Sequence, residues 1–464
     1  MRTPSLASGP EGARALRPLL ATVLDALDTG ARSRGGPLPA GGPQAVAARL
    51  RRAVGEVLPG RGDPQALHTL VRAVAEGAAD PAHPHCAAHL HCPPLAVAAA
   101  ADLAASVLNP SLDSWDQAPA ASELEAMVTQ ALAREIHGPG GSPDALATTG
   151  GTEANHLALL LAREARGGTV RLVVGDNAHH SLPRATWLLG LPDPVVVAAP
   201  GGRLDPAALD AALSRTPGPL LVAATAGTTD AGLIDPLPEI ADRCAAHGAR
   251  LHIDAAYGGA LLFSTRRRTL LDGLDAADTV TLDLHKLGWQ PAAAGILTVR
   301  DPGDLAALRH RADYLNADDD TDAGLPDLLG RSLRTTRRPD ILKLAVTLKT
   351  LGRDGLGALV DQVCARAEEF AALVRDHPGF DLHAPPALST VLFRPTAAPD
   401  TTVAAVRRAL LTDGTAVLGR ARLDGRLWLK ATLLNPATGP DDLAALLHLV
   451  AARRATLAEG HTPR

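Results

Sequence analysis

The sequence predicts an α/β protein whose core is a mostly parallel β-sheet covered by helices on both faces. From about residue 145 onward, segments with helical spacing alternate with short runs of β-branched and other apolar residues. This alternation is typical of a parallel sheet built from strand–helix–strand units and buried between layers of helices. The chain has 464 residues, which allows about two to four domains at ~100–200 residues each.

The expected elements follow one another in a regular order. We expect strands over residues 169–174, 195–197, 220–225, 250–254 and 279–283, and helices over 153–166, 206–215 and 237–246. Ligands of such sheets bind at the carboxyl ends of the strands. Side chains that directly follow these strands are therefore the first candidates for function.

The flanking segments divide the chain into three expected parts. Residues 1–82 carry helical patterns broken by Gly and Pro, and we expect them to form an N-terminal helical segment. Residues 83–352 form the expected large α/β domain, which ends in a helix near Gly352. Residues 353–464 are expected to form a small α+β domain, with short strands over 391–393 and 427–429.

Composition excludes several classes of partner. Lys and Arg number 45 against 50 Asp and Glu, so the net charge is −5, and aromatic residues make up only 2%. The chain thus lacks the positive field and the stacking surface that nucleic acid requires. It has no apolar stretch of about 18 residues, no leader-like N-terminus and only four scattered cysteines, so we expect no membrane partner and a cytoplasmic location.

Lys286 is one of only four lysines, and it follows the expected strand 279–283 almost directly. A lysine at a strand end in a pocket can lose its proton by desolvation and then form a Schiff base. Taken alone, a lysine in this position is more often a solvated loop residue. Its neighbours must decide between these two interpretations.

A second candidate is Asp254, which ends the expected strand 250–254. A buried carboxylate needs a cationic or hydrogen-bonding partner, and a protonated pyridine nitrogen is one such partner. The small Ala256 next to it leaves room for a flat ring. The alternative is that Asp254 simply caps the following turn.

The third candidate is the glycine-containing turn at 148–155, Thr-Thr-Gly-Gly-Thr-Glu-Ala-Asn, which opens a helix. Free N–H groups of a first helical turn, together with hydroxyls, suit a phosphate, and Gly151 and Thr152 lie at this point. The turn matches neither the ATP-binding P-loop nor the dinucleotide motif, and a plain helix cap is the alternative. Residues 177–181, which include His179, and 224–229, which end at Thr229, follow two other strands.

In this order the segments TTGGTEAN, AHHS, ATAGTT, HIDAAYGG and LDLHK resemble the group II pyridoxal-dependent decarboxylases. The branch most similar in appearance acts on 2,4-diaminobutyrate, lysine or ornithine. Further segments that carry this resemblance lie at residues 89–93, 113–117, 312–316, 335–338 and 433–436. The resemblance implies the aspartate-aminotransferase-like fold (fold type I), with a seven-stranded sheet and pyridoxal 5′-phosphate as cofactor.

The resemblance also implies a role for each candidate residue. Lys286 would hold the cofactor covalently, Asp254 would pair with its pyridinium nitrogen, and His179 would stack on its ring; these three are the expected catalytic residues. The remaining expected cofactor contacts are Gly151, Thr152 and His285 at the phosphate, Thr229 near the phenolic oxygen, and Ala256 beside the ring. The expected substrate contacts are His89, Trp115 and Gln290.

The function implied is decarboxylation of an L-amino acid, most simply a basic diamino acid, to an amine and CO₂. Relatives of the aromatic amino acid enzyme carry a mobile-loop tyrosine that assists protonation, yet neither Tyr257 nor Tyr314 lies within 317–331. His179 is the substitute proton donor. Slow protonation would favour the alternative chemistry, in which oxygen reacts and an aldehyde forms.

The resemblance further implies a homodimer with active sites at its interface and the N-terminal segment packed on the partner. An aminotransferase shares the fold, but it generally needs an arginine for the substrate carboxylate, and the His285-Lys286 pair favours decarboxylation. A non-catalytic relative would be expected to have lost Lys286 or Asp254, and both are present.

Two further features have alternative interpretations. A cluster of imidazoles and thiols suggests zinc, but its spacing matches no common structural site, so we expect no metal; its members are His83, His85, Cys86, His89, His91 and Cys92. The acidic stretch 316–324 is either a solvated face, an attraction for a cationic substrate, or a lid that excludes water.

Overall fold

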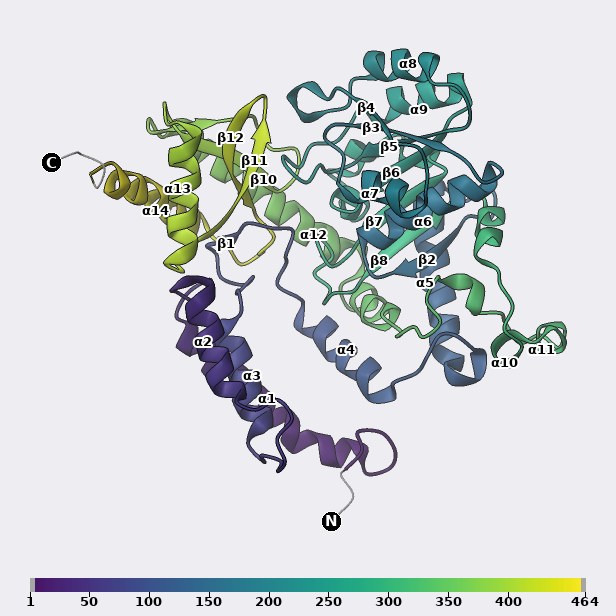
Figure 1. Cartoon of the computed structure of the whole chain (residues 1–464), viewed down its shortest axis with the longest axis horizontal. Coiled ribbons are helices and arrows are strands. Elements are labelled where there is room, and N and C mark those ends of the chain that lie inside the picture. The colour runs from purple at the N-terminus through teal and green to yellow at the C-terminus, as the bar shows by residue number, and fades with distance from the viewer. Residues whose placement is uncertain (1–4, 460–464) are drawn as a thin grey trace. The chain divides into compact units, whose positions relative to one another are not determined.

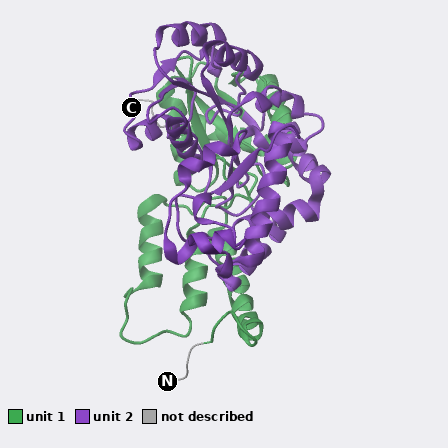
Figure 2. Ribbon diagram, turned by 90° about the vertical axis from the view of Figure 1, so that its right-hand side faces the viewer, with its two compact units in different colours: residues 1–93, 366–385, 391–464 green, residues 94–365, 386–390 purple. Residues whose placement is uncertain are grey.

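The structure is a computed structural model that describes residues 5–459. Residues 1–4 and 460–464, the outermost parts of the expected segments 1–82 and 353–464, lie outside the described residues. The chain divides into two compact units (Figures 1 and 2): unit 1 comprises residues 1–93, 366–385 and 391–464, and unit 2 comprises residues 94–365 and 386–390.

Unit 2 is built on a seven-stranded sheet with the order β2-β8-β7-β6-β5-β3-β4. The strands are β2 (Asp144–Thr148), β3 (Arg171–Gly175), β4 (Val195–Val197), β5 (Leu220–Thr225), β6 (Arg250–Ala255), β7 (Thr279–Asp283) and β8 (Gly295–Val299). The pairs from β4 through β3, β5 and β6 to β7 are parallel, and β8 is antiparallel to both of its neighbours. The predicted mostly parallel α/β fold is confirmed.

Several helices of unit 2 pack against this sheet, whereas α10 and α11 lie away from it (Figure 1). The helices that lie wholly within unit 2 are α4 (Ala96–Leu108), α5 (Pro119–His137), α6 (Gly151–Ala165), α7 (Ser181–Leu188), α8 (Pro206–Arg215), α9 (Leu237–His247) and the short α10 (Asp313–Asn316) and α11 (Asp318–Asp322). The central helix is α6, because it contributes to two core clusters. Leu157 and Leu161 pack with residues of β2 and β8, whereas Leu159 and Ala162 pack with residues of β3 and β5.

Unit 1 has a five-stranded sheet with the order β1-β11-β12-β10-β9. Its strands are β1 (Cys86–Ala87), β9 (Phe380–Leu382), β10 (Thr390–Pro395), β11 (Val417–Leu423) and β12 (Arg426–Thr432). The helices α13 (Asp400–Thr412) and α14 (Pro440–Glu459) pack beside it and share its apolar core. The expected strands at 391–393 and 427–429 correspond to β10 and β12.

The N-terminal part of unit 1 is helical, with α1 (Gly12–Arg34), α2 (Gly42–Val54) and α3 (Ala66–Gly77). Helices α1 and α3 pack closely because Gly30 has no side chain: a Cβ there would lie 2.6 Å from the Cβ of Ala75. Several leucines of these helices face outward, among them Leu24 at 66% exposure.

The long helix α12 (Ile341–Asp376) bends at Gly352, whose φ of 64° is left-handed. The division between the two units falls further along this helix, after residue 365. The three-part division at residues 82 and 352 stays a prediction. Among residues 5–459, no helix is both long enough and apolar enough to span a membrane.

Candidate functional site

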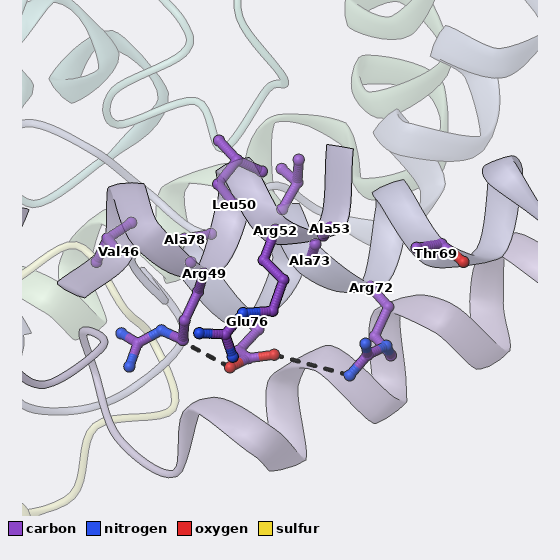
Figure 3. A pocket seen from close by; sticks show the side chains of 12 residues that line it. Val46, Arg49, Leu50, Arg52, Ala53, Thr69, Arg72, Ala73, Glu76 and Ala78 are labelled. Atoms are coloured by element: carbon purple, nitrogen blue, oxygen red, sulfur yellow. Dashed lines mark ion pairs between the residues drawn. The ribbon is translucent and has the colours of Figure 1, made fainter. Parts of the chain in front are cut away.

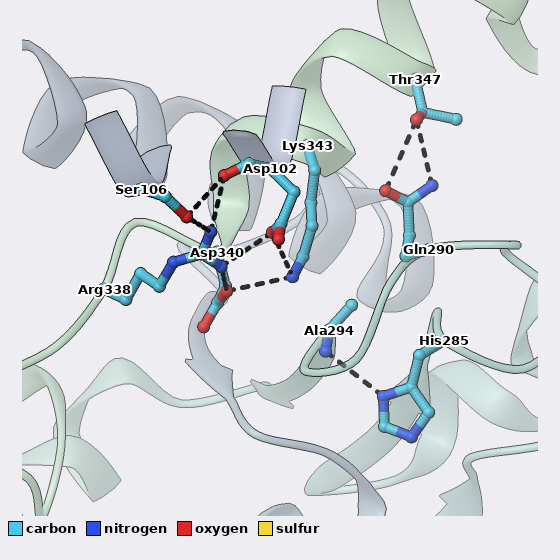
Figure 4. Close-up of polar contacts among 9 residues, drawn as sticks. All are labelled: Asp102, Ser106, His285, Gln290, Ala294, Arg338, Asp340, Lys343 and Thr347. Carbon is cyan, nitrogen blue, oxygen red and sulfur yellow. Dashed lines mark hydrogen bonds and ion pairs between the residues drawn. The ribbon is translucent and has the colours of Figure 1, made fainter. Parts of the chain in front are cut away.

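The carboxyl end of β7 places Lys286 next to a buried carboxylate. The Lys286 ammonium nitrogen lies 3.4 Å from Asp283 Oδ2, and the Asp283 side chain is only 3% exposed. His285 Nδ1 lies 2.8 Å from the other carboxylate oxygen, Oδ1. The same ring nitrogen lies 3.3 Å from the backbone amide of Ala294 (Figure 4). Lysine, histidine and aspartate thus form one compact group at this strand end.

Asp254 lies at the end of the neighbouring strand β6, and it is held at both of its oxygens. Oδ2 accepts a hydrogen bond of 2.7 Å from the side-chain amide of Asn155, and Oδ1 accepts one of 3.0 Å from the backbone amide of Ala256. The residue is 4% exposed. A buried carboxylate fixed in this way stays oriented, and it is suited to pair with a protonated ring nitrogen.

Asn155 connects Asp254 to a buried polar network. Its amide oxygen accepts hydrogen bonds from His252 Nε2 and the Thr281 hydroxyl, each at 3.0 Å. Its amide nitrogen also donates to Ser181 Oγ at 3.0 Å. Every hydrogen-bonding position of this amide is therefore in use, which fixes its orientation.

Ser181 extends the network to His179. The Ser181 hydroxyl lies 2.8 Å from His179 Nδ1, and because its oxygen already accepts from Asn155, its proton is available to that ring nitrogen. Nδ1 is then an acceptor, which places the proton of the neutral imidazole on Nε2. Burial lowers the pKa of His179, although the nearby Asp254 opposes this shift. The neutral ring is therefore favoured.

The N-terminus of α6 comes so close to these groups that only glycine fits there. A Cβ at Gly151 would lie 2.9 Å from the Cβ of Ala256, and one at Gly150 would lie 2.8 Å from Cε1 of His285. Gly150 also has a φ of 152°. The first turn is further stabilised by Glu153, whose carboxylate accepts from the amide and hydroxyl of Thr149. The helix thereby presents its N-terminal amides to the strand ends.

The remaining predicted contacts lie outside this cluster or at its edge. Thr152, in the first turn of α6, and Thr229, in the turn after β5, are both exposed. Gln290 is buried, and its amide donates to the Gly288 carbonyl and to Thr347 of α12 (Figure 4). Trp115 is 41% exposed, and His89 belongs to unit 1, where burial and the charge of Lys430 lower its pKa.

The histidines and cysteines of residues 83–92 do not come together as a metal site in the described structure. In the described part of the chain, no group of three or more His, Cys, Asp or Glu side chains could hold a metal ion. The rings of His83 and His85 pack edge to face at 5.2 Å, and burial raises the pKa of the Cys86 thiol to about 11.

Tyr314 lies on a segment that begins before the interval 317–331. Residues 309–328 form one excursion between two 3₁₀ turns, Pro302–Leu308 and Leu329–Arg331, and the excursion includes both α10 and α11. Tyr314 lies on α10 with 82% of its surface exposed. The excursion that begins at 309 thus contains a tyrosine, whereas the interval 317–331 contains none. Tyr257, in contrast, is buried and bonded to Ser389 and Thr390.

Sequence reasoning also missed Asn155 and Asp283. Asn155 lies one helical turn after Gly151, so a polar residue on the apolar face of α6 was the available signal. The residues present fit pyridoxal phosphate, since a lysine amine, an oriented carboxylate and the N-terminal amides of a helix that begins with glycine lie at the ends of neighbouring strands. A parallel sheet that gathers these groups at its strand ends defines the fold-type-I class of pyridoxal phosphate enzymes.

Comparison with known proteins gives the family. The model of the pyridoxal-dependent decarboxylase conserved domain matches residues 50–396. The L-2,4-diaminobutyrate decarboxylase of Rhizobium meliloti (strain 1021) is 42% identical over 407 residues, which cover 84% of this chain and 82% of that protein. The protein of the same name from Acinetobacter baumannii is 32% identical, covering 85% of this chain and 84% of its own length.

Solved structures agree with this result. The glutamate decarboxylase domain of a diaminobutyrate-pyruvate transaminase and L-2,4-diaminobutyrate decarboxylase from Vibrio parahaemolyticus has a TM-score of 0.85 at 30% identity, covering 97% of this chain and 98% of that one. Oryza sativa TDC, solved with PLP and tryptamine, shares the fold with a TM-score of 0.88 at 24% identity, covering 97% and 99%. The chain belongs to the pyridoxal-dependent decarboxylase family. It is an amino acid decarboxylase that uses pyridoxal phosphate.

Proposed function

We propose that this enzyme decarboxylates L-2,4-diaminobutyrate or a closely related basic diamino acid, and that it serves a biosynthetic pathway. The observation that carries the proposal is the 42% identity to a diaminobutyrate decarboxylase over 84% of the chain. Function belongs to the site and not to the fold, so the substrate is tested directly.

The test is an incubation of the cofactor-loaded enzyme with diaminobutyrate, ornithine, lysine, aspartate, glutamate and aromatic amino acids. Mass spectrometry identifies the products while dissolved oxygen is monitored. We expect the diamine and CO₂ from diaminobutyrate, with the highest kcat/KM of the panel and no oxygen uptake. A higher kcat/KM for an acidic or aromatic amino acid would overturn the proposed substrate.

We assign the following roles to the chain's own residues. When bound, pyridoxal phosphate supplies the electron sink that accepts the electron pair left on Cα when CO₂ departs. Lys286 would hold the cofactor through its amine. Asp254 keeps the ring nitrogen protonated, and Asn155 and the Ala256 amide hold that carboxylate in one orientation.

Other assigned contacts surround the ring and the phosphate. His179 would cover one ring face, and Ala256 would lie beside the ring. Gly151, Thr152 and His285 bind the phosphate, and Thr229 lies near the phenolic oxygen. His89, Trp115 and Gln290 are the proposed substrate contacts, of which Gln290 is the most constrained because its amide is already bonded within unit 2.

We further propose that Tyr314 returns the proton to Cα, with His179 as the second candidate. The exposed position of Tyr314 on the 309–328 excursion supports this role, since such a segment can close over a site and exclude water. The aldehyde-forming alternative then becomes the expected behaviour of a variant. Tyr314→Phe should form aldehyde and consume oxygen, whereas His179→Gln should slow amine formation. Unchanged amine formation by Tyr314→Phe would contradict the role of the tyrosine.

The N-terminal helices support the proposed homodimer. Leu19, Leu24 and Leu27 of α1 are 48%, 66% and 45% exposed. Beside them, α2 and α3 form a largely apolar groove with Val46, Leu50 and Ala73 in its wall, and Glu76 pairs with arginines at its edge (Figure 3). Apolar surface of this extent is typical of an interface. We propose that it packs on the partner, with active sites at the interface. Four free thiols are consistent with the proposed cytoplasmic location.

A further inference from the structure

Asp283 occupies the place that the α6 N-terminus offers to an anion. Its Oδ2 accepts a hydrogen bond of 3.1 Å from the Gly151 amide and lies 3.4 Å from Lys286 Nζ, while Oδ1 lies 2.8 Å from His285 Nδ1. Gly151 and His285 are also the proposed phosphate contacts, and Lys286 is the proposed anchor of the cofactor. One buried carboxylate therefore contacts the same three groups that the cofactor requires.

In this arrangement Asp283 is a stable anion. Burial alone would raise the pKa of its carboxyl, but the contact with His285, the charge of Lys286 and the Gly151 amide outweigh burial and hold the pKa below its ordinary value. The ionised state of Asp283 thus depends on groups that the cofactor would also contact.

Cofactor binding changes two of these partners at once. The phosphate adds between one and two negative charges at neutral pH and competes for the Gly151 amide. The Lys286 ammonium would condense with the cofactor aldehyde and release water, and its nitrogen would keep one proton and the positive charge but only one N–H donor in place of three. A buried carboxylate that loses hydrogen-bond donors and gains an anionic neighbour binds a proton more tightly.

We propose that Asp283 takes up one proton from solvent when pyridoxal phosphate binds, so that a neutral carboxylic acid stands beside the phosphate. Binding of the cofactor then becomes weaker as pH rises, beyond any dependence due to the cofactor itself. This inference rests on the proposed phosphate site, and it concerns cofactor affinity independently of which amino acid is decarboxylated.

The other charged groups around Asp283 keep their own partners. From β6, Asp254 is bonded to Asn155 and Ala256, and from the segment after β3, His179 is bonded to Ser181. On α6, Glu153 pairs with Arg334. On the neighbouring strand β8 the residue opposite Asp283 is Gly295, and a glycine has no side chain that could titrate. Within residues 5–459, His285, whose Nδ1 lies 2.8 Å from Asp283 Oδ1, is the group placed to take the proton instead.

The test compares the wild-type enzyme with Asp283→Asn after removal of the cofactor. Pyridoxal phosphate is titrated into each protein at several pH values, and calorimetry in two buffers of different ionisation enthalpy counts the protons. We expect the wild type to take up one proton more per site than the variant. Its Kd should accordingly rise about tenfold more per pH unit on the alkaline side. Asp193→Asn, which neutralises an exposed carboxylate, should behave like the wild type.

A second measurement uses the wild-type protein and does not depend on how the variant folds. The infrared difference spectrum of cofactor binding should contain the carbonyl band of a protonated carboxylic acid, and this band should be absent for Asp283→Asn. Equal proton uptake by the two proteins would overturn the inference. A wild-type spectrum without the band would also overturn it and would assign the proton to His285. Tight cofactor binding with either result would leave the proposed function intact.

Discussion

The reactivity of Lys286 depends on the residues that surround its amine. Its nitrogen lies 3.4 Å from a buried carboxylate, and its side chain is 20% exposed, so it is neither a solvated surface lysine nor a sealed core lysine. An amine that is partly desolvated and reachable can become a nucleophile once it loses its proton.

Replacing Lys286 by Ala should remove the absorbance of the lysine-bound cofactor and lower kcat by roughly a thousandfold or more, because the residue acts on the reacting atoms. The measurement is a visible absorbance spectrum of the purified variant together with its turnover. Lys349→Ala, at an exposed position of α12, is the matched control and should keep both. A Lys286→Ala protein with the wild-type spectrum would refute the assignment.

Lys286 and Asp254 could be predicted because each directly follows a recognisable strand, where a parallel sheet presents its ligands. Asn155 could not be predicted in the same way. Its role depends on contacts with His252 and Thr281, which lie about a hundred residues or more further along the chain, and no local pattern reports such contacts. Asp283 was visible beside His285, but only the fold brings Gly151 against it.

At the scale of elements, strand β6 carries His252, whose imidazole is neutral in the folded protein. His252 is fully buried between α6 and β7, with Nε2 bonded to Asn155 and Nδ1 2.9 Å from the Thr279 hydroxyl. Burial lowers its pKa from 6.5 to about 4, although Asp254 opposes the shift. A proton on this ring would oppose the network that orients Asp254.

The free energy of unfolding should therefore fall as pH drops from 6.5 to about 4. In that window the unfolded chain binds a proton at this position and the folded chain does not. For His252 alone the loss is about 3 kcal/mol. Denaturant unfolding at several pH values checks this.

His252→Gln is the variant that isolates this contribution, because an amide can still donate to Asn155 but does not titrate. It should unfold with a smaller pH dependence than the wild type within the window, while His310→Gln, at an exposed position, should keep the wild-type dependence. Equal slopes for His252→Gln and wild type would contradict the prediction. His137, whose pKa burial also lowers to about 4, remains as a separate contribution in all three proteins.

The five parallel strands from β3 to β7 could be predicted from the sequence, whereas β2 and β8 were not predicted. β5 reads Leu-Leu-Val-Ala-Ala-Thr and is buried throughout, as a central parallel strand should be. β2 reads Asp-Ala-Leu-Ala-Thr, a composition that suits a helix equally well, and it becomes a strand through pairing with β8. Polar residues likewise give no local signal for where the 309–328 excursion begins.

At the scale of the whole molecule, the proposed dimer depends on the outward leucines of the N-terminal helices. Leu24→Glu should weaken dimerisation by at least about tenfold, since it would place a carboxylate against an apolar partner surface. Sedimentation analysis across a concentration series measures the change. Val57→Glu alters a residue that is 77% exposed in the connection between α2 and α3, and it should leave the dimer intact. An unchanged dimer in Leu24→Glu would contradict the proposed interface.

Local sequence patterns do not predict which strands pair in the sheet of unit 1. Its sheet joins β1, at residues 86–87, to β11, which begins at residue 417. Pairing over such a distance is decided by the packing of the whole unit, so periodicity and turn residues do not report it. The sequence patterns therefore predicted the layers of unit 2 more completely than the order of strands in unit 1.

The parallel pairing of β1 with β11 also has a consequence for synthesis in the cell. The ribosome releases the chain from its N-terminus, so β1 emerges long before its partner strand exists. The continuous stretch 94–365, which supplies most of unit 2, can collapse around its own core in the meantime. The sheet of unit 1 must wait until translation is nearly complete, and closing so long a loop is slow. A nascent chain stalled before residue 417 should therefore protect unit 2 from protease while leaving the segment around β1 open to cleavage.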